Sequence, residues 1–279
     1  MIRIVCLLAT AAIVTSCLAA DTECKPQAPC YSGESIANIA SGSPGALAPN
    51  TLVSIQGTNL SYVEKAITAA DIVAGELPIM LPGTGVRVLI RAYADQAVGG
   101  YPAHIYLASP GQVTLLIPCD LRPGDYTLQV VRDGTTGPAV QVTLHAADPA
   151  MFQVDKASVV ASHLDYSLVS EQAPAVPGEW VILWATGLGA VSPPAVYGVL
   201  PTQAAKLQQM SSFRVLLDGV AVASERIGYA GVAPGWGGLY QINLKLPEGA
   251  GPNPEIRVAV GDAISPSGLR LWVTPAATH

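Results

Sequence analysis

Two stretches of the chain alternate between apolar and polar residues directly after a turn rich in glycine and proline. In the stretch at 231–247, apolar residues occupy every second position from 240 to 246, after the turn sequence Pro-Gly-Trp-Gly-Gly. An alternation with a period of two is typical of a strand with one buried face, and Pro247 ends this one. The stretch at 107–118 repeats the pattern around Ser-Pro-Gly. The two stretches therefore predict two copies of one β domain.

Further correspondences run through the whole chain. Residues 86–89 (Val-Arg-Val-Leu) match 213–216 (Phe-Arg-Val-Leu), and 49–53 match 177–181, with offsets of 213 − 86 = 127 and 177 − 49 = 128 residues. An offset that stays nearly constant over a domain indicates duplication. The remaining predicted strands pair in the same way: 126–130 with 256–260, and 140–144 with 269–273.

The number and spacing of the predicted strands indicate the fold of each copy. About seven short strands in roughly 100 residues, separated by turns such as Asp133-Gly134, are typical of an immunoglobulin-like β-sandwich. We therefore expect an all-β chain with two tandem immunoglobulin-like domains, at 34–148 and 149–279. A signal peptide at 1–20 and a linker with cysteine and proline at 21–33 precede them.

The first residues have the features of an export signal. A short basic segment precedes an apolar segment at 4–14, which is too short to span a bilayer. Two cleavage sites fit: a lipobox that ends at Cys17 and leaves it as the lipidated first residue, or Leu-Ala-Ala at 18–20. Both predict export to the periplasm, cell envelope or extracellular space of a bacterium, and the first adds a lipid anchor. No later apolar run has the length of a transmembrane helix.

The composition supports a large core and excludes one class of partner. Hydrophobic residues make up 50% of the 279 residues, charged residues make up 12%, and the formal net charge is −6. Half-apolar composition is ample for burial. An acidic chain without clustered lysine and arginine does not attract a phosphate backbone, so no nucleic-acid partner is expected.

Three of the five cysteines, Cys24, Cys30 and Cys119, lie after the signal peptide. In an oxidising compartment Cys24 and Cys30 can close a short loop and leave Cys119 over, or the N-terminal segment can be joined to the first domain through Cys119. The sequence does not decide between these pairings. No histidine or cysteine lies at ligand spacing around this group, so neither a metal site nor a cofactor is expected.

The chain offers no recognisable set of catalytic residues. Its four histidines, His104, His145, His163 and His279, are accompanied by no Gly-x-Ser-x-Gly nucleophile motif. His163 and Asp165 share one strand face, where the carboxylate can orient the imidazole, but no nucleophile accompanies them. The acidic residues fall mainly in turns and form no Asp-x-Asp-x-Asp calcium loop. We therefore expect that the protein is not an enzyme.

Aromatic residues are the candidates for ligand binding. Trp236 lies between glycines in the turn of 231–247, where its ring can stack on a sugar or a partner, or fold back over the end of the sandwich. Tyr240 and Tyr101 are weaker candidates. The other three tryptophans lie in strand patterns and are expected in the core: Trp180, Trp184 and Trp272.

Two segments resemble known families. Ala-Pro-Asn-Thr-Leu-Val-Ser-Ile-Gln-Gly-Thr-Asn-Leu at 48–60 resembles the opening of an IPT/TIG-type immunoglobulin-like domain. The segment at 177–189 (Pro-Gly-Glu-Trp-Val-Ile-Leu-Trp-Ala-Thr-Gly-Leu-Gly), with 229–231 and 238–243, resembles the Solibacter-type uncharacterised C-terminal domain family. This resemblance implies a pair of extracytoplasmic β-sandwiches and supplies no catalytic residues. The family's domains usually end longer proteins, whereas here they make up nearly the whole chain.

Three classes of function remain. The favoured one is a non-catalytic surface or extracellular module for adhesion, matrix contact or presentation, whose partner is an extracellular protein or a polysaccharide. The second is a carbohydrate-binding protein that uses loop aromatics, with Trp236 first. The third, an exported hydrolase, has the least support.

Overall fold

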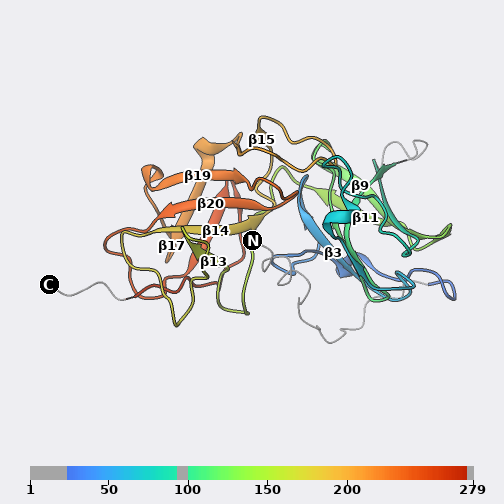
Figure 1. Cartoon of the computed structure of the whole chain (residues 1–279), viewed down its shortest axis with the longest axis horizontal. Coiled ribbons are helices and arrows are strands. Elements are labelled where there is room, and N and C mark those ends of the chain that lie inside the picture. Colours follow the sequence, from blue (N-terminus) through green and yellow to red (C-terminus); the bar gives the residue numbers. More distant parts are fainter. Residues whose placement is uncertain (1–23, 93–99, 275–279) are drawn as a thin grey trace.

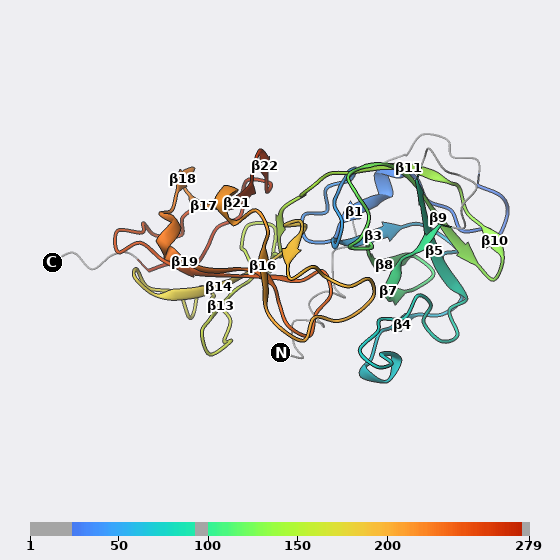
Figure 2. The same ribbon diagram turned by 90° about the horizontal axis from the view of Figure 1, so that it is seen from above.

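The computed structural model describes residues 24–92 and 100–274, which form two β-sandwiches side by side along the long axis of the molecule (Figures 1 and 2). The expected signal peptide, Cys17 and His279 lie outside the described residues. Within those residues, no helix has the length and apolar character needed to cross a membrane. Helical structure in this part of the chain consists of short 3-10 turns: Gly33–Ser35, Ala69–Asp71, Met210–Ser212 and Ser224–Arg226.

The first sandwich has two sheets that face one another across a buried core. One sheet has the order β1 (Ile36–Asn38), β3 (Leu52–Gln56), β8 (Gln112–Leu116), β7 (His104–Ala108) and β4 (Lys65–Ala66). The other has the order β2 (Ala46–Leu47), β11 (Val140–Leu144), β9 (Gly124–Arg132), β5 (Val86–Ala92) and β6 (Tyr101–Pro102), with β10 (Thr135–Thr136) paired to β9. The pairs are antiparallel except β2 with β11. This is the two-sheet arrangement of immunoglobulin-like domains.

The second sandwich repeats the arrangement with a longer first sheet. This sheet has the order β12 (Ala150–Met151), β14 (Trp180–Thr186), β20 (Tyr240–Lys245), β19 (Ile227–Val232), β16 (Ala205–Leu207) and β15 (Val191–Ser192), with β13 (Ala161–His163) also on β14. The facing sheet has the order β18 (Val220–Ala221), β17 (Phe213–Leu217), β21 (Ile256–Val260) and β22 (Ala263–Ile264).

The two alternating stretches that predict the duplication form equivalent hairpins. β7 and β8 pair with each other and β8 pairs with β3, just as β19 and β20 pair and β20 lies on β14. Along β20 every second residue is buried, as the alternation predicts. The Asp133-Gly134 turn is also confirmed: both residues have positive φ, and the turn joins β9 to β10. The prediction of an all-β chain with tandem immunoglobulin-like domains is therefore confirmed.

The predicted closing strand of the second copy, at 269–273, differs from its counterpart β11. It forms isolated bridges instead of a continuous ladder, because its backbone groups alternate between two neighbours. Arg270 donates its N–H to Ala157 on one side, while Leu271 donates to Pro254 on the other. The segment therefore lies between two parts of the sandwich and belongs to neither sheet as a regular strand.

The expectation that residues 21–33 form a linker needs correction, because residues 24–33 pack against the first sandwich. Cys24 and Cys30 are joined by a disulfide, and Cys119 is free. Cys30 pairs with Thr58 through two backbone hydrogen bonds of 2.9 Å. The Tyr31 ring is 4% exposed and belongs to the first core. This arm is part of the first sandwich, since a free linker would bury no aromatic ring.

The two sandwiches share a buried apolar cluster in addition to their own cores. The shared cluster draws Leu52, Leu77 and Leu116 from the first sandwich and Ile182 and Trp184 from the second, among others. β14 is therefore buried on both faces, since Val181, Leu183 and Ala185 on its other face belong to the second core. Burial of apolar surface is the main favourable term in such contacts, so the cluster ties the sandwiches into one unit.

Buried hydrogen bonds cross the same junction. The Asn50 side chain donates to the Tyr240 hydroxyl at 3.0 Å, and this hydroxyl donates to the Gly189 carbonyl at 2.5 Å. The Leu52 N–H donates to Thr186 Oγ1 at 3.1 Å. The Asn50 amide and the Leu52 N–H donate across the junction, so they fix how the sandwiches lie against each other, because separation would break both bonds.

Residues 193–204, here called the junction loop, extend this contact over the first sandwich. Leu77 donates its N–H to the Gly198 carbonyl at 2.8 Å, and Leu200 donates its N–H to Gly75 at 2.9 Å. The loop thus forms a short antiparallel contact with the connection that precedes β5 in the first sandwich.

Candidate functional site

The histidines lie apart from one another. His104 is buried at the junction, whereas His145 is exposed just after β11 and His163 ends β13. Within residues 24–92 and 100–274, no group of three or more His, Cys, Asp or Glu side chains is placed to hold a metal ion. The three histidines in the described part of the chain therefore lie in separate surroundings.

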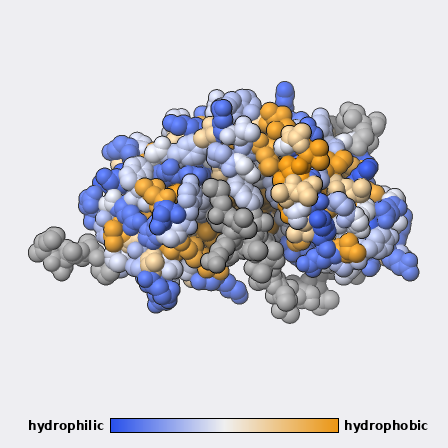
Figure 3. Space-filling view, viewed as in Figure 1, coloured by the Kyte–Doolittle hydropathy of each residue, from blue (hydrophilic) through white to orange (hydrophobic). Residues whose placement is uncertain are grey.

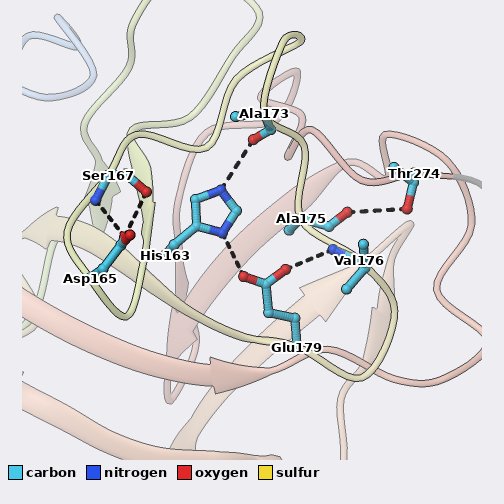
Figure 4. A network of polar contacts seen from close by, with 8 residues as sticks. All are labelled: His163, Asp165, Ser167, Ala173, Ala175, Val176, Glu179 and Thr274. Atoms are coloured by element: carbon cyan, nitrogen blue, oxygen red, sulfur yellow. Dashed lines mark hydrogen bonds and ion pairs between the residues drawn. The ribbon is translucent and has the colours of Figure 1, made fainter.

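His163 takes part in a polar network at the start of β14 (Figure 4). Its Nδ1 donates to Glu179 Oε1 at 2.5 Å, and its Nε2 donates to the Ala173 carbonyl at 3.2 Å. The second Glu179 oxygen accepts the Val176 N–H, while Asp165 accepts two hydrogen bonds from Ser167. The predicted pairing of His163 with Asp165 is therefore corrected: Glu179 orients the ring, and Asp165 closes its own turn.

This geometry favours the charged form of the imidazole. Two ring nitrogens that both donate require a protonated ring. The hydrogen bond to Glu179 raises the pKa of His163 above its usual value, against an opposing effect of burial, and Asp165 adds a smaller contribution in the same direction. The network ties the 163–179 loop to the sheet, which is a structural role.

We expect the His163–Glu179 pair to make stability depend on pH. The pKa of His163 is higher in the folded chain than in the unfolded chain, where it is about 6.5. The pair therefore contributes its full stabilisation of the folded state below about pH 6.5, and this contribution is lost as the pH rises through the folded-state pKa. His163→Gln should therefore destabilise at pH 5.5 by up to about 1 kcal/mol and by much less at pH 9. Urea unfolding at both pH values measures this difference. Glu179→Gln should reproduce it, and a pH-independent loss would contradict the expectation.

A cavity of about 250 Å³, open to solvent on one side, lies at the junction between the first sandwich, the junction loop and the adjacent strands of the second sandwich. The exposed Thr202 and Gln203 mark its solvent side. The lining is mainly apolar and includes Leu116, Pro118, Val191, Pro193, Leu200 and Trp236. An apolar cavity with a few polar groups at its wall is the usual form of a small-molecule site.

His104 is the buried titratable side chain at the cavity wall. It is 5% exposed, and its Nδ1 donates to the Leu77 carbonyl at 2.8 Å, while Nε2 has no hydrogen-bond partner. Burial lowers the pKa of His104, so the ring is neutral at pH 7 and Nε2 carries a free lone pair. The Tyr197 ring packs against it, with 4.6 Å between the ring centroids.

Cys119 also lines the cavity, as a neutral thiol. Its Sγ donates to the Ala195 carbonyl at 3.4 Å. Burial, with a further contribution from Asp120, raises the pKa of the thiol to about 11. Because the thiolate is the nucleophile, this cysteine is poorly suited to covalent chemistry at neutral pH.

The three candidate aromatic residues have different surroundings. Trp236 is half-buried: it packs against the shared cluster and lines the cavity. Tyr101 is 44% exposed on β6 and is not part of the cavity wall. Tyr240 is fully buried, so its assignment as a ligand-binding aromatic is corrected: a ring without exposed surface cannot stack on a sugar. Among the tryptophans expected in the core, Trp184 is buried, whereas Trp180 and Trp272 are half-buried.

The presence of three residues at this site could not be predicted from the sequence. Asn50, His104 and Gly198 come from different parts of the chain and meet only because the junction forms. Gly198 has a φ of +71°, and a Cβ at this position would collide with the His104 ring. A glycine in the junction loop is a weak signal by itself, since glycines are common in turns.

The fold and the junction define a protein with two tandem immunoglobulin-like β-sandwiches that are packed as one unit. No protein-family model and no curated protein matches the chain. Among solved structures, it is similar to SGBP-B of the Bacteroides ovatus mixed-linkage glucan utilization locus, in complex with a mixed-linkage heptasaccharide. The identity is 12%, the match covers 82% of this chain and 43% of that chain, and the TM-score is 0.31.

Two further solved structures show similarity of the same kind. SGBP-B from a complex xyloglucan utilization locus in Bacteroides uniformis is 10% identical over 88% of this chain and 49% of that one, with a TM-score of 0.27. The titin domains z1z2 in complex with telethonin are 13% identical over 89% and 94% of the two chains, with a TM-score of 0.22. The match thus spans less than half of either SGBP-B chain. Likeness at this level concerns the sandwich architecture and carries no argument on function.

Proposed function

We propose that the chain is a non-catalytic, exported surface module that acts in adhesion, matrix contact or presentation. The observation that carries the proposal is the shared cluster, which holds two sandwiches in one fixed arrangement. A fixed arrangement suits a module that presents a surface to a partner, because little conformational freedom is lost on binding. The export signal at 1–20, with a lipid anchor at Cys17 if the lipobox is used, and the resemblance to IPT/TIG-type and Solibacter-type domains agree with this role.

Apolar surface beside the junction supports a contact role. Figure 3 shows apolar residues gathered on one side of the molecule, over the first sandwich next to the junction. Val73, on the connection before β5, and Val196, in the junction loop, are 72% and 64% exposed. Exposed apolar patches often mark surfaces that bind a partner.

Binding to the polymers of the cell exterior tests the proposal. The exported chain, produced without residues 1–20, is incubated with cell-envelope and extracellular polymer fractions, and retention is measured by sedimentation. We expect at least one fraction to retain it without any release of soluble fragments. Release of sugars or peptides from the fraction would support an enzyme, and the absence of retention on every fraction would argue against a surface module.

A carbohydrate-binding role is the alternative, and the place of Trp236 favours it. The half-buried ring lies at the cavity wall, where one face is supported by the shared cluster. Stacking of a sugar on an indole is worth about 0.5–1.5 kcal/mol, by analogy with other aromatic contacts. Trp236→Ala should then lower retention on a polysaccharide about tenfold and leave the melting temperature within a few degrees. Equal retention of the wild type and Trp236→Ala would contradict a role of Trp236 in carbohydrate binding.

A further inference from the structure

The N-terminal arm starts at the end of the first sandwich that lies away from the second. β3 begins at Leu52, which belongs to the shared cluster, and leads toward Thr58, which pairs with Cys30 of the arm. Six residues of extended chain place Thr58 about 20 Å from Leu52. The start of the arm is therefore held at the opposite end of the first sandwich from the junction.

Arg132 joins the arm to an exposed aromatic residue at this end. Its guanidinium donates to the Gln27 carbonyl of the arm and to the Asn59 carbonyl, both at 2.5 Å. The same group lies 4.2 Å from the centroid of the Tyr62 ring. Tyr62 is 58% exposed, and its neighbour Val63 is 45% exposed. A small apolar surface thus lies beside the start of the arm, and we call this part of the molecule, residues 24–30 with 59–63, the arm end.

The predicted lipid anchor would hold the arm end close to a bilayer. When the lipobox is used, the lipidated Cys17 precedes Cys24 by seven residues. Seven residues of fully extended chain span at most about 25 Å. An acyl chain in the bilayer therefore keeps Cys24 within this distance of the membrane. The disulfide from Cys24 to Cys30 extends this restraint to the arm, because Cys30 is paired with the first sandwich.

The side chains of the arm end suit the boundary between water and lipid. Tyrosine is enriched at this boundary, because its ring is apolar and its hydroxyl is polar. The exposed Val63 adds apolar surface to the ring of Tyr62. Glu64, the next residue, is also exposed, and a carboxylate is costly in the acyl region. The contact is therefore confined to the lipid headgroups.

We propose that the arm end binds the surface of a phospholipid bilayer, with Tyr62 and Val63 among the headgroups and the second sandwich directed away from the membrane. This proposal rests on the lipid-anchored form of the proposed function. It adds an orientation to that function, because the shared cluster fixes the second sandwich relative to the first. The junction and the second sandwich then remain free to meet a partner.

The test measures which end of the molecule lies at the lipid. The chain without residues 1–16 carries Cys119→Ser, so that Cys17 is the free thiol that couples to a maleimide phospholipid in nanodiscs. Val63 at the arm end and Val220 on β18 serve as matched, exposed methyl reporters. A nitroxide on the lipid headgroup should reduce the methyl NMR signals of Val63 at least twofold and leave those of Val220 unchanged. Equal loss at both valines, or no loss at Val63, would overturn the proposal.

Two tyrosine variants separate side-chain contact from nearness that the anchor alone would cause. Tyr62→Ser should reduce the signal loss at Val63 at least twofold. Tyr101→Ser removes another exposed ring of the first sandwich and should leave that loss unchanged. Equal loss in the wild type and Tyr62→Ser would show that the ring makes no contact with the lipid, and would overturn the proposal. Shifts of the Val63 signals with protein concentration in lipid-free solution would assign the surface to a second copy of the chain instead.

Failure of the anchor gives a different result from failure of the surface. In cells, Cys17→Ser should move the protein from the membrane fraction to the soluble fraction. If the wild type and this variant fractionate alike, the anchor is wrong, and the proposed orientation is overturned with it. If fractionation changes as expected and the nanodisc result is negative, the anchor stands and the arm end is not its contact surface.

Discussion

Replacing Trp184 with alanine is expected to destabilise the protein by about 3–5 kcal/mol, the usual cost of truncating a buried tryptophan. The side chain is 4% exposed, belongs to the shared cluster and donates from Nε1 to Ser162 Oγ at 3.1 Å. Because the cluster couples the two sandwiches, the wild type should unfold in one calorimetric transition and the variant in two. Urea unfolding gives the free energy, and differential scanning calorimetry gives the number of transitions.

Trp180 provides the matched control for this substitution. It lies on the same strand and the same face as Trp184, four residues earlier, but it is half-buried and outside the shared cluster. Trp180→Ala should cost about 1 kcal/mol and leave a single transition. If both variants lose the same stability, or if Trp184→Ala still unfolds in one transition, the shared cluster does not couple the sandwiches.

Removal of the Tyr31 side chain should have an effect of similar size in the first sandwich. The buried ring packs in the core, and its hydroxyl donates to the Pro138 carbonyl at 2.6 Å and accepts the Val130 N–H at 2.7 Å. We expect Tyr31→Ala to cost about 3–5 kcal/mol in urea unfolding. Hydrogen exchange of residues 24–33 should rise at the same time, because the arm loses its main buried contact.

Two further substitutions separate the ring of Tyr31 from its hydroxyl. Tyr31→Phe keeps the ring and leaves the two backbone groups unpaired, which should cost about 1–3 kcal/mol. Tyr62 is 58% exposed, and the guanidinium carbon of Arg132 lies 4.2 Å from the centroid of its ring. Tyr62→Ala should therefore cost only about 0.5–1 kcal/mol of stability. A Tyr31→Ala variant as stable as Tyr62→Ala would mean that the arm is not held by this residue.

Local pattern was enough to predict most of the strands and the tandem arrangement of the two sandwiches. The alternation at 240–246 predicts which residues face the core, because side chains alternate across a strand and only one face of β20 lies on the core. The Asp133-Gly134 turn is equally local, since both residues accept positive φ at low cost. Such features depend on neighbours in sequence and can be predicted from them.

The junction was not predicted, because its contacts join distant residues. The hydrogen bond from Asn50 to Tyr240 spans 190 positions, and no pattern around either residue indicates it. One signal was present: residues 180–185 are apolar without interruption, which is typical of a strand buried on both faces. The burial of Tyr31 could not be predicted either, because a single aromatic residue after Cys30 forms no periodic pattern of apolar positions. The cavity could not be predicted for the same reason as the junction, because its wall forms only when the two sandwiches pack together.

The apolar outer face of β14 has a consequence for the history of the chain. Domains that arise by gene duplication start with the same sequence, and each can fold without the other. Here Ile182 and Trp184 sit where a solitary sandwich would present polar side chains to water. The second sandwich alone would expose this apolar face to water, so each sandwich is expected to depend on its neighbour for solubility.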